Sequence, residues 1–296
     1  MRPLDLSLST KRAARRAVVD RLGVVARRIR PALRARADEP EGVHRLRIAT
    51  RRAGAALALF EPCFRGRDLD RIRKLLRGLR RAAAAVRDAD VQAELWRGVA
   101  EGEPGLAPLL APVLEHLAES RAAATASLRA RAAGPGRVRR AARRAARGAR
   151  GARIGGERAA DLATLAGWRI AELTEALRSR VEGGLAEPED LHEARIAVKR
   201  LRYTLELVGG GLQTDAGALV ELVRAAHARL GDHQDLVVAR ALIASVSARG
   251  ALGGEEAAPL NAAIETRRRA VERAARESLA WLLAGLEGDR RRAPAA

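Results

Sequence analysis

The motif that decides the fold reads EPEGVHRLRIATRR at residues 39–52 and returns as EPEDLHEARIAVKR at residues 187–200. A second pair follows in the same order, since RDADV at residues 87–91 corresponds to QDLVV at residues 234–238. The two offsets are 148 and 147 residues, about half of the 296-residue chain. Self-similarity with a long period indicates a repeated structural unit. We therefore expect a duplication of one helical unit.

The composition favours helices. Hydrophobic residues make up 48% of the chain but aromatic residues only 2%, which is too apolar for disorder and too poor in aromatic residues for an all-β protein. Alanine, leucine, arginine and glutamate are strong helix formers, so the predicted fold class is all-α. Glycine and proline divide the chain into four predicted helices per half, near residues 8–36, 40–60, 69–94 and 105–131, and near 157–180, 188–208, 216–244 and 256–286.

These helices define a single domain with two halves. We place the first half at residues 8–134 and the second at 159–286, joined by an Arg/Ala/Gly-rich connector at 135–158 and followed by a basic tail at 287–296. The connector can form a short helix at 137–147, and the glycines that follow favour a loose segment.

Cysteine content and hydropathy exclude several classes of protein. Cys63 is the only cysteine, which rules out an internal disulfide and a cysteine zinc site. No uncharged apolar run approaches the roughly 18 residues of a membrane span, and residues 1–16 show no secretory signal. We expect a cytoplasmic protein without a membrane segment, cofactor or metal; the sequence is silent on its oligomeric state.

The positive charge is large and unevenly distributed. Lysine and arginine number 56 against 36 acidic residues, a formal net charge of +20. The net charge is +13 over residues 1–134, +8 over 135–158 and −1 over 159–296. Fifty-three of the cations are arginine, whose planar guanidinium fits two phosphate oxygens at once. Because a GC-rich genome also favours arginine and alanine, the total charge alone does not identify the partner.

Each motif helix carries a basic ridge. At about 100° per residue, His44, Arg47 and Arg51 lie on one face, opposite the apolar residues of the same helix. In the second copy the same face carries four basic residues, His192, Arg195, Lys199 and Arg202. Acidic partners at i+4, which usually neutralise a solvated helix face, are expected to be missing from this stripe. The alternative is a solvated helix whose arginines extend over apolar neighbours.

The helix after each motif adds further basic residues and an aspartate. Arg73, Arg77, Arg80 and Arg81 mark this helix in the first half, and Arg224 and His227 align with Arg77 and Arg80 in the second. Asp88 and Asp235 lie 44 and 43 residues after the motif histidines. They either orient a histidine or arginine of the ridge or are ordinary surface or capping residues.

The paired motif His-x-x-Arg-Ile-Ala-x-Arg/Lys-Arg, with Leu-Arg-Tyr after the second copy and LGDHQDL at residues 230–236, resembles the CHAD family (conserved histidine α-helical domain) over residues 10–286. The resemblance implies two pseudo-symmetric four-helix bundles with a basic cleft or pore between them. It also implies binding of inorganic polyphosphate and, in bacteria, association with polyphosphate granules. Some CHAD proteins carry a CYTH triphosphatase domain; we expect a stand-alone CHAD domain here.

The candidate polyphosphate-binding residues come from both motif helices and from the helices that follow them. They are His44, Arg47, Arg51, Arg52, Arg77, Arg80, His192, Arg195, Lys199, Arg200, Arg202, Arg224 and His227, with Asp88, Asp235 and Tyr203 in supporting roles. Tyr203 either touches the ligand or forms part of the cleft wall. The other five aromatic residues fit core or near-core positions: Phe60, Phe64, Trp96, Trp168 and Trp281. The first copy reads Arg-Ala-Gly at residues 52–54 where the second reads Arg-Leu-Arg at 200–202, so one basic position is lost.

Other functions are weaker on the sequence. No phosphate-cradling glycine loop and no acidic cluster for magnesium lies beside the ridges, so we expect no catalytic residues and no enzyme activity. A nucleic-acid-binding protein is the alternative, but it would normally offer aromatic residues for stacking on bases. A second alternative is an accessory module of polyphosphate or triphosphate metabolism enzymes. The histidines, with an ordinary pKa of about 6.5, would add charge at mildly acid pH.

Overall fold

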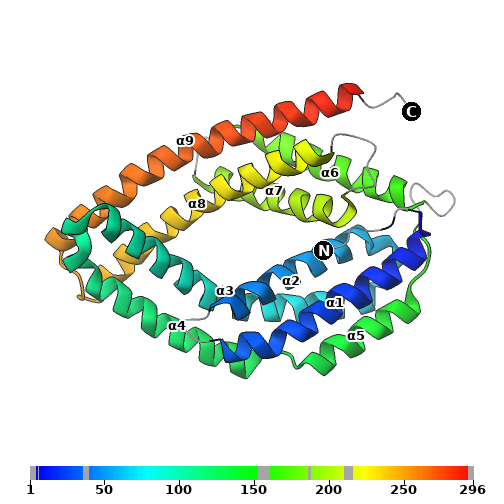
Figure 1. Ribbon diagram of the computed structural model, residues 1–296, viewed down its shortest axis with the longest axis horizontal. Coiled ribbons are helices and arrows are strands. Elements are labelled where there is room, and N and C mark those ends of the chain that lie inside the picture. Colours follow the sequence, from blue (N-terminus) through cyan, green and yellow to red (C-terminus); the bar gives the residue numbers. More distant parts are fainter. Residues whose placement is uncertain are drawn as a thin grey trace.

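The computed structural model describes residues 5, 7–35, 40–152, 161–185, 188–209 and 216–292 (Figure 1). Across these residues the chain is helical, and the one β-bridge is isolated, between Ser9 and Asp161. The predicted all-α fold is confirmed. The helices are α1 (Thr10–Arg34), α2 (Glu41–Leu59), α3 (Gly66–Gly102), α4 (Ala111–Arg131), α5 (Pro135–Gly148), α6 (Leu162–Glu182), α7 (Pro188–Val208), α8 (Ala216–Ala248) and α9 (Gly254–Arg292), with 3₁₀ helices at Glu61–Cys63 and Pro104–Leu110.

The predicted helices agree with the observed ones to within a few residues at most ends. The main difference is α3, which continues to Gly102, eight residues beyond the predicted end. Gly98 is the one glycine inside that extension, which ends at Gly102, and a single glycine costs about 1 kcal/mol without ending a helix. The long α3 places one face of its first half beside α2 and its second half in a separate core.

Three apolar clusters hold the molecule together. The first is formed mainly by α1, α2, α5 and the beginning of α3. The third is formed by α6, α7, the beginning of α8 and the end of α9. The second joins the end of α3 and α4 to the end of α8 and the beginning of α9, around the buried Trp96. In Figure 1 these four helices meet at one end of the molecule, and two helical arms extend from it.

The joining cluster was not foreseen from the sequence. Two separate four-helix bundles would need only two cores, whereas the long helices α3 and α8 each contribute to two clusters. The pseudo-symmetry of the two halves stays a prediction.

The connector begins as helix α5, which packs against α1 and α3. Val138, Ala141 and Ala145 of α5 are buried against α1 and α3, and Ala149 and Ala152 beyond the helix are buried as well. A backbone hydrogen bond from Arg150 to Cys63 fixes this segment. The predicted short helix is therefore confirmed, while the glycines at 155 and 156 lie outside the described residues.

The burial of the aromatic residues was predicted only in part. Phe60, Phe64 and Trp96 are buried, but Trp168 is 50% exposed and Trp281 is 70% exposed, so their core assignment was wrong. Leu279 and Leu282, which are fully buried on either side of Trp281 in the sequence, already fill the buried stripe of α9 at that point. No helix in the described part of the chain is long and apolar enough to cross a membrane.

Candidate functional site

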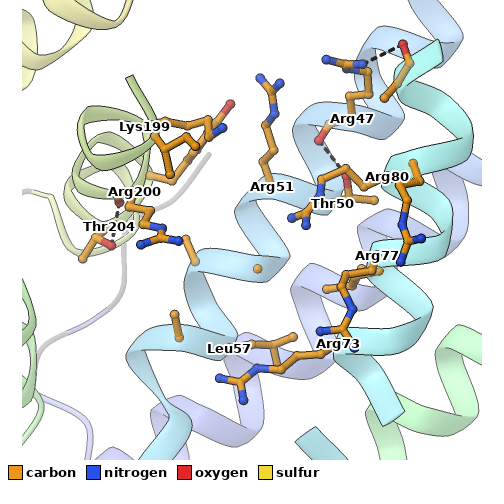
Figure 2. A pocket seen from close by; sticks show the side chains of 18 of the residues that line it. Arg47, Thr50, Arg51, Leu57, Arg73, Arg77, Arg80, Lys199, Arg200 and Thr204 are labelled. Carbon is orange, nitrogen blue, oxygen red and sulfur yellow. Dashed lines mark hydrogen bonds between the residues drawn. The ribbon is translucent and has the colours of Figure 1, made fainter. Parts of the chain in front are cut away.

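A pocket of about 620 Å³ lies between α2, α3 and α7, with one further side chain from α6 (Figure 2). Its lining contains nine cationic side chains and no carboxylate among the described residues. The cations are Arg47, Arg51, Arg73, Arg77, Arg80, Arg81, Arg169, Lys199 and Arg200. Such a lining selects for an anionic ligand because the cations focus one sign of potential inside a concave surface.

Helix α2 forms one wall because its residues separate into two faces. Arg47, Arg51 and Gly54 recur at intervals of four and three residues, which places them on one side of a helix. Leu46 and Ala53 lie on the buried side, in the first apolar cluster. Gly54 aligns with Arg202 of the repeat, and a Cβ at this position would have no atom within 4 Å. The missing side chain therefore widens the pocket.

Helix α7 forms the opposite wall with Lys199, Arg200, Tyr203 and Thr204. Tyr203 is only 6% exposed, and the guanidinium of Arg202 lies 5.6 Å from the centre of its ring, a distance at which a cation is attracted to an aromatic face. Tyr203 therefore forms part of the pocket wall, and its contact with the ligand stays a prediction.

Helix α3 supplies a row of four arginines to the pocket. Arg73, Arg77, Arg80 and Arg81 recur at helical spacing and all line it. Figure 2 shows Arg77 and Arg80 on this helix, across the pocket from Lys199 and Arg200. The candidate list from the sequence included Arg77 and Arg80 but left out Arg73 and Arg81, although the spacing already placed them on the same stripe.

Six of the nine cations have no carboxylate partner. Arg47 pairs with Asp88 at 3.0 Å, Arg73 with Glu61 at 2.7 Å, and Arg169 with the Glu172 carboxylate. No carboxylate of the described residues lies within 4.0 Å of the side chains of Arg51, Arg77, Arg80, Arg81, Lys199 or Arg200. Like charges at this density repel one another, so the lining carries a repulsion that negative charge would offset.

Arg51 lies among the other cations of the pocket, and its charge acts on several of them. In Figure 2 its side chain extends between Lys199 on one side and Arg47 and Arg80 on the other. Burial, together with the charges of Arg195 and Arg51, lowers the pKa of Lys199 to about 8. Burial followed by the charge of Arg51 also lowers the pKa of Arg80. Burial and neighbouring like charges therefore destabilise the ionised forms of Lys199 and Arg80.

Asp88 contacts an arginine of the ridge directly, whereas Asp235 acts on one only through its charge; their supporting roles in binding stay predictions. Arg47 donates hydrogen bonds to Asp88 Oδ1 and to the Ala84 carbonyl, each at 3.0 Å. Asp235 is largely withdrawn from solvent; burial raises its pKa to about 6, against the opposing charge of Arg195. No hydrogen bond joins Asp235 to Arg195 within the described chain.

Arg52 and Arg202 are not part of the pocket lining and share a carboxylate partner. Glu206, whose side chain is 8% exposed, lies 3.2 Å from Arg52 of α2 and 3.0 Å from Arg202 of α7. The expected absence of acidic i+4 partners is therefore wrong at Arg202. Because Glu206 is itself on α7, its ion pair with Arg52 joins α2 to α7, while its pair with Arg202 stays within α7.

None of the predicted histidines lines the pocket. His192 is exposed and its Nδ1 lies 2.6 Å from the Gln234 amide oxygen. His227 accepts a hydrogen bond from Arg202, and burial, with the charge of Arg202, lowers its pKa to about 3. Burial, with the charge of Arg87, also lowers the pKa of His44. Histidine protonation at mildly acid pH is thus disfavoured at His44 and His227, contrary to the hypothesis drawn from the sequence.

The two remaining candidates lie beside the pocket or outside it. Arg195 is half-buried close enough to Lys199 to lower its pKa, and the Arg195 Nε atom is buried without a hydrogen-bond partner in the described structure. Arg224 is exposed and pairs with Glu221. In contrast, the sequence offered no signal for Arg169, which comes from a helix without a motif in the electrically neutral half.

The comparisons with known proteins agree with this architecture. The CHAD domain matches residues 15–244, and the chain belongs to the CHAD family. The crystal structure of the CHAD domain from the plant Ricinus communis is similar, with 22% identity, a TM-score of 0.67 and 94% of each chain covered. PptA from Streptomyces chartreusis is similar at 20% identity with a TM-score of 0.66, over 90% of this chain and 98% of PptA. No curated protein matches the chain by sequence.

Proposed function

We propose that this CHAD protein binds inorganic polyphosphate without chemical turnover in the pocket between α2, α3 and α7. The family is linked to polyphosphate. The observation that carries the proposal is the nine-cation lining without a carboxylate, in which six cations have no ion-pair partner in the described chain. A linear polymer with a negative charge on every unit would supply those partners along its length.

The lining favours phosphate over bases. Eight of its nine cations are arginines, and a guanidinium donates two parallel hydrogen bonds to phosphate oxygens. Proteins that bind single-stranded nucleic acid add aromatic faces on which bases stack. Tyr203 is the one aromatic residue in the lining, and its ring is buried and near the Arg202 guanidinium. Bases would therefore find no stacking surface.

The lining also supports binding without catalysis. It contains no histidine, cysteine, serine or carboxylate to act as a nucleophile or general base. The hydroxyls of Thr50 and Thr204 donate to the carbonyls of Arg47 and Arg200 on their own helices, so they are engaged in local hydrogen bonds. Among the described residues no group of three acidic, histidine or cysteine side chains could hold a metal ion.

Substitution of Arg51 separates binding from folding. Arg51 has no carboxylate partner among the described residues and is surrounded by cations, so Arg51→Ala should remove repulsion and raise the melting temperature. The same change should weaken polyphosphate binding roughly tenfold, as expected for a hydrogen bond to a charged group. Arg224→Ala, at an exposed arginine paired with Glu221, is the matched control and should leave affinity unchanged.

The ligand class is tested by competition. Long-chain polyphosphate and single-stranded DNA of equal charge are compared in titrations at about 0.15 M salt, where the Debye length is about 8 Å. We expect tighter binding of polyphosphate, and loss of that preference in Arg51→Ala. Equal affinity for both polymers would overturn the proposal and support nucleic-acid binding.

A further inference from the structure

The basic surface does not end at the rim of the pocket. Residues 69–86 of α3 hold six cations and a single carboxylate, Asp70. With Arg73 set at 0° and about 100° per residue, the pocket-lining cations Arg80, Arg77 and Arg81 lie at about 340°, 40° and 80°. Lys74, which is exposed, follows at about 100° and Arg71 at about 160°. The cations therefore continue around the solvent-facing side of α3.

The far end of this series opens into a groove between α3 and α5. The groove has a volume of about 370 Å³ and is lined by Arg71 and Leu75 of α3 and by Arg137, Arg140, Ala141 and Arg144 of α5. Helix α5 carries six arginines and no acidic residue. Because its alanines and Val138 are packed against α1 and α3, its arginines are turned to solvent.

The acid nearest the groove is already neutralised. Asp68 is 13% exposed at its side chain and lies 3.1 Å from Arg144 and 3.9 Å from Arg71. Arg137 and Arg140 have no carboxylate of the described residues within 4.0 Å. The groove thus keeps a surplus of unpaired guanidiniums, as the pocket does.

We propose that a long phosphate polyanion held in the pocket leaves it over the exposed face of α3, past Lys74, and places a second segment in the groove at Arg137 and Arg140. This inference rests on the proposed function of the pocket and adds a preference for chain length. A short oligomer fills the pocket alone. In a longer polymer the second segment binds intramolecularly, at a high effective concentration, so affinity rises with length.

The test combines two ligands with three charge-matched double variants. Tripolyphosphate and long-chain polyphosphate are titrated into wild type, Arg137→Ala/Arg140→Ala, and the control Arg240→Ala/Arg249→Ala, whose arginines are exposed on α8 and the turn after it. Alanine is the best helix former, so α5 should remain folded, which circular dichroism verifies. Arg77→Ala/Arg80→Ala serves as the pocket variant.

The expected pattern distinguishes the extension from the pocket. Arg137→Ala/Arg140→Ala should weaken long-chain binding several-fold and lower its salt slope by about 1.4, at about 0.7 per lost phosphate contact, while tripolyphosphate affinity stays unchanged. Equal long-chain affinity in this variant and in the control would overturn the extension alone, provided the pocket variant still loses binding. If the pocket variant keeps wild-type affinity for both ligands, the proposed function fails and the extension with it. Weaker binding of single-stranded DNA by the α5 variant, with polyphosphate unaffected, would instead assign the groove to nucleic acid.

Discussion

The double substitution Arg77→Ala/Arg80→Ala should change the salt dependence of polyphosphate binding by a calculable amount. Both arginines are exposed on α3, line the pocket and have no carboxylate partner in the described chain. Alanine preserves helix propensity, and neither arginine is buried in the core. The variant therefore removes two phosphate contacts while leaving the framework of the pocket intact.

The magnitude follows from the number of unpaired cations. With six of them in the pocket and about 0.7 released counterions per contact, the slope of log affinity against log salt should be about −4. Between 50 and 200 mM salt this amounts to a loss of about 300-fold in affinity. The variant keeps four unpaired cations, so its slope should be about −2.8 and its loss about 50-fold. Contacts outside the pocket would make both slopes steeper without changing their difference of about 1.4.

Fluorescence anisotropy with end-labelled polyphosphate, repeated at several salt concentrations, measures both slopes. The control is Arg224→Ala/Arg229→Ala, which removes the same charge from the aligned stretch of α8, outside the pocket. Its slope should equal that of the wild type. Identical slopes for the pocket variant and the wild type would refute the assignment of Arg77 and Arg80 to the binding site, whatever the absolute affinities.

Three further outcomes follow from individual residues. Because the pKa of Lys199 is lowered to about 8, polyphosphate affinity should fall as the pH rises from 7 to 9, and Lys199→Arg should remove this fall; a pH-independent wild type would contradict it. The pKa of Asp235 is raised from 3.8 to about 6, so between these values the folded state binds more protons than the unfolded state and stability falls as the pH rises. Asp235→Asn should abolish that fall and raise the melting temperature at pH 7, and an unchanged pH profile in thermal scans would count against the burial of this carboxyl. Gly54→Ala should raise the free energy of unfolding by about 1 kcal/mol, because its Cβ meets no atom within 4 Å. Gly42→Ala should lower it, because a Cβ there would lie 2.8 Å from the Pro31 carbonyl oxygen; denaturant titrations that rank the two variants in the opposite order would show that the α1–α2 contact is loose.

The sequence by itself determined the helices and most of the basic stripes. Helix propensity, apolar periodicity and the positions of glycine and proline act over a few residues, so they predict elements such as α2 and α7 without knowledge of their neighbours. The duplicated motif and its downstream echo showed that two helices would present similar basic faces. On the same basis Arg47, Arg51, Arg77, Arg80, Lys199 and Arg200 were placed on helix faces that the structure brings into one pocket.

Only the tertiary structure decided which cations remain unpaired and which serve the fold. Arg52 and Arg202 belong to the same motifs as the pocket residues, yet both bind Glu206 of α7, and the pair with Arg52 joins α2 to α7. His227 aligns with Arg80 but is half-buried and held neutral, whereas Arg169 enters the pocket from a helix without a motif. The rotation of each helix, the burial of each charge and the distance to a carboxylate depend on contacts between residues far apart in the chain. Local sequence therefore predicts that a face is basic, and packing between helices determines whether its charges meet a carboxylate or an open pocket.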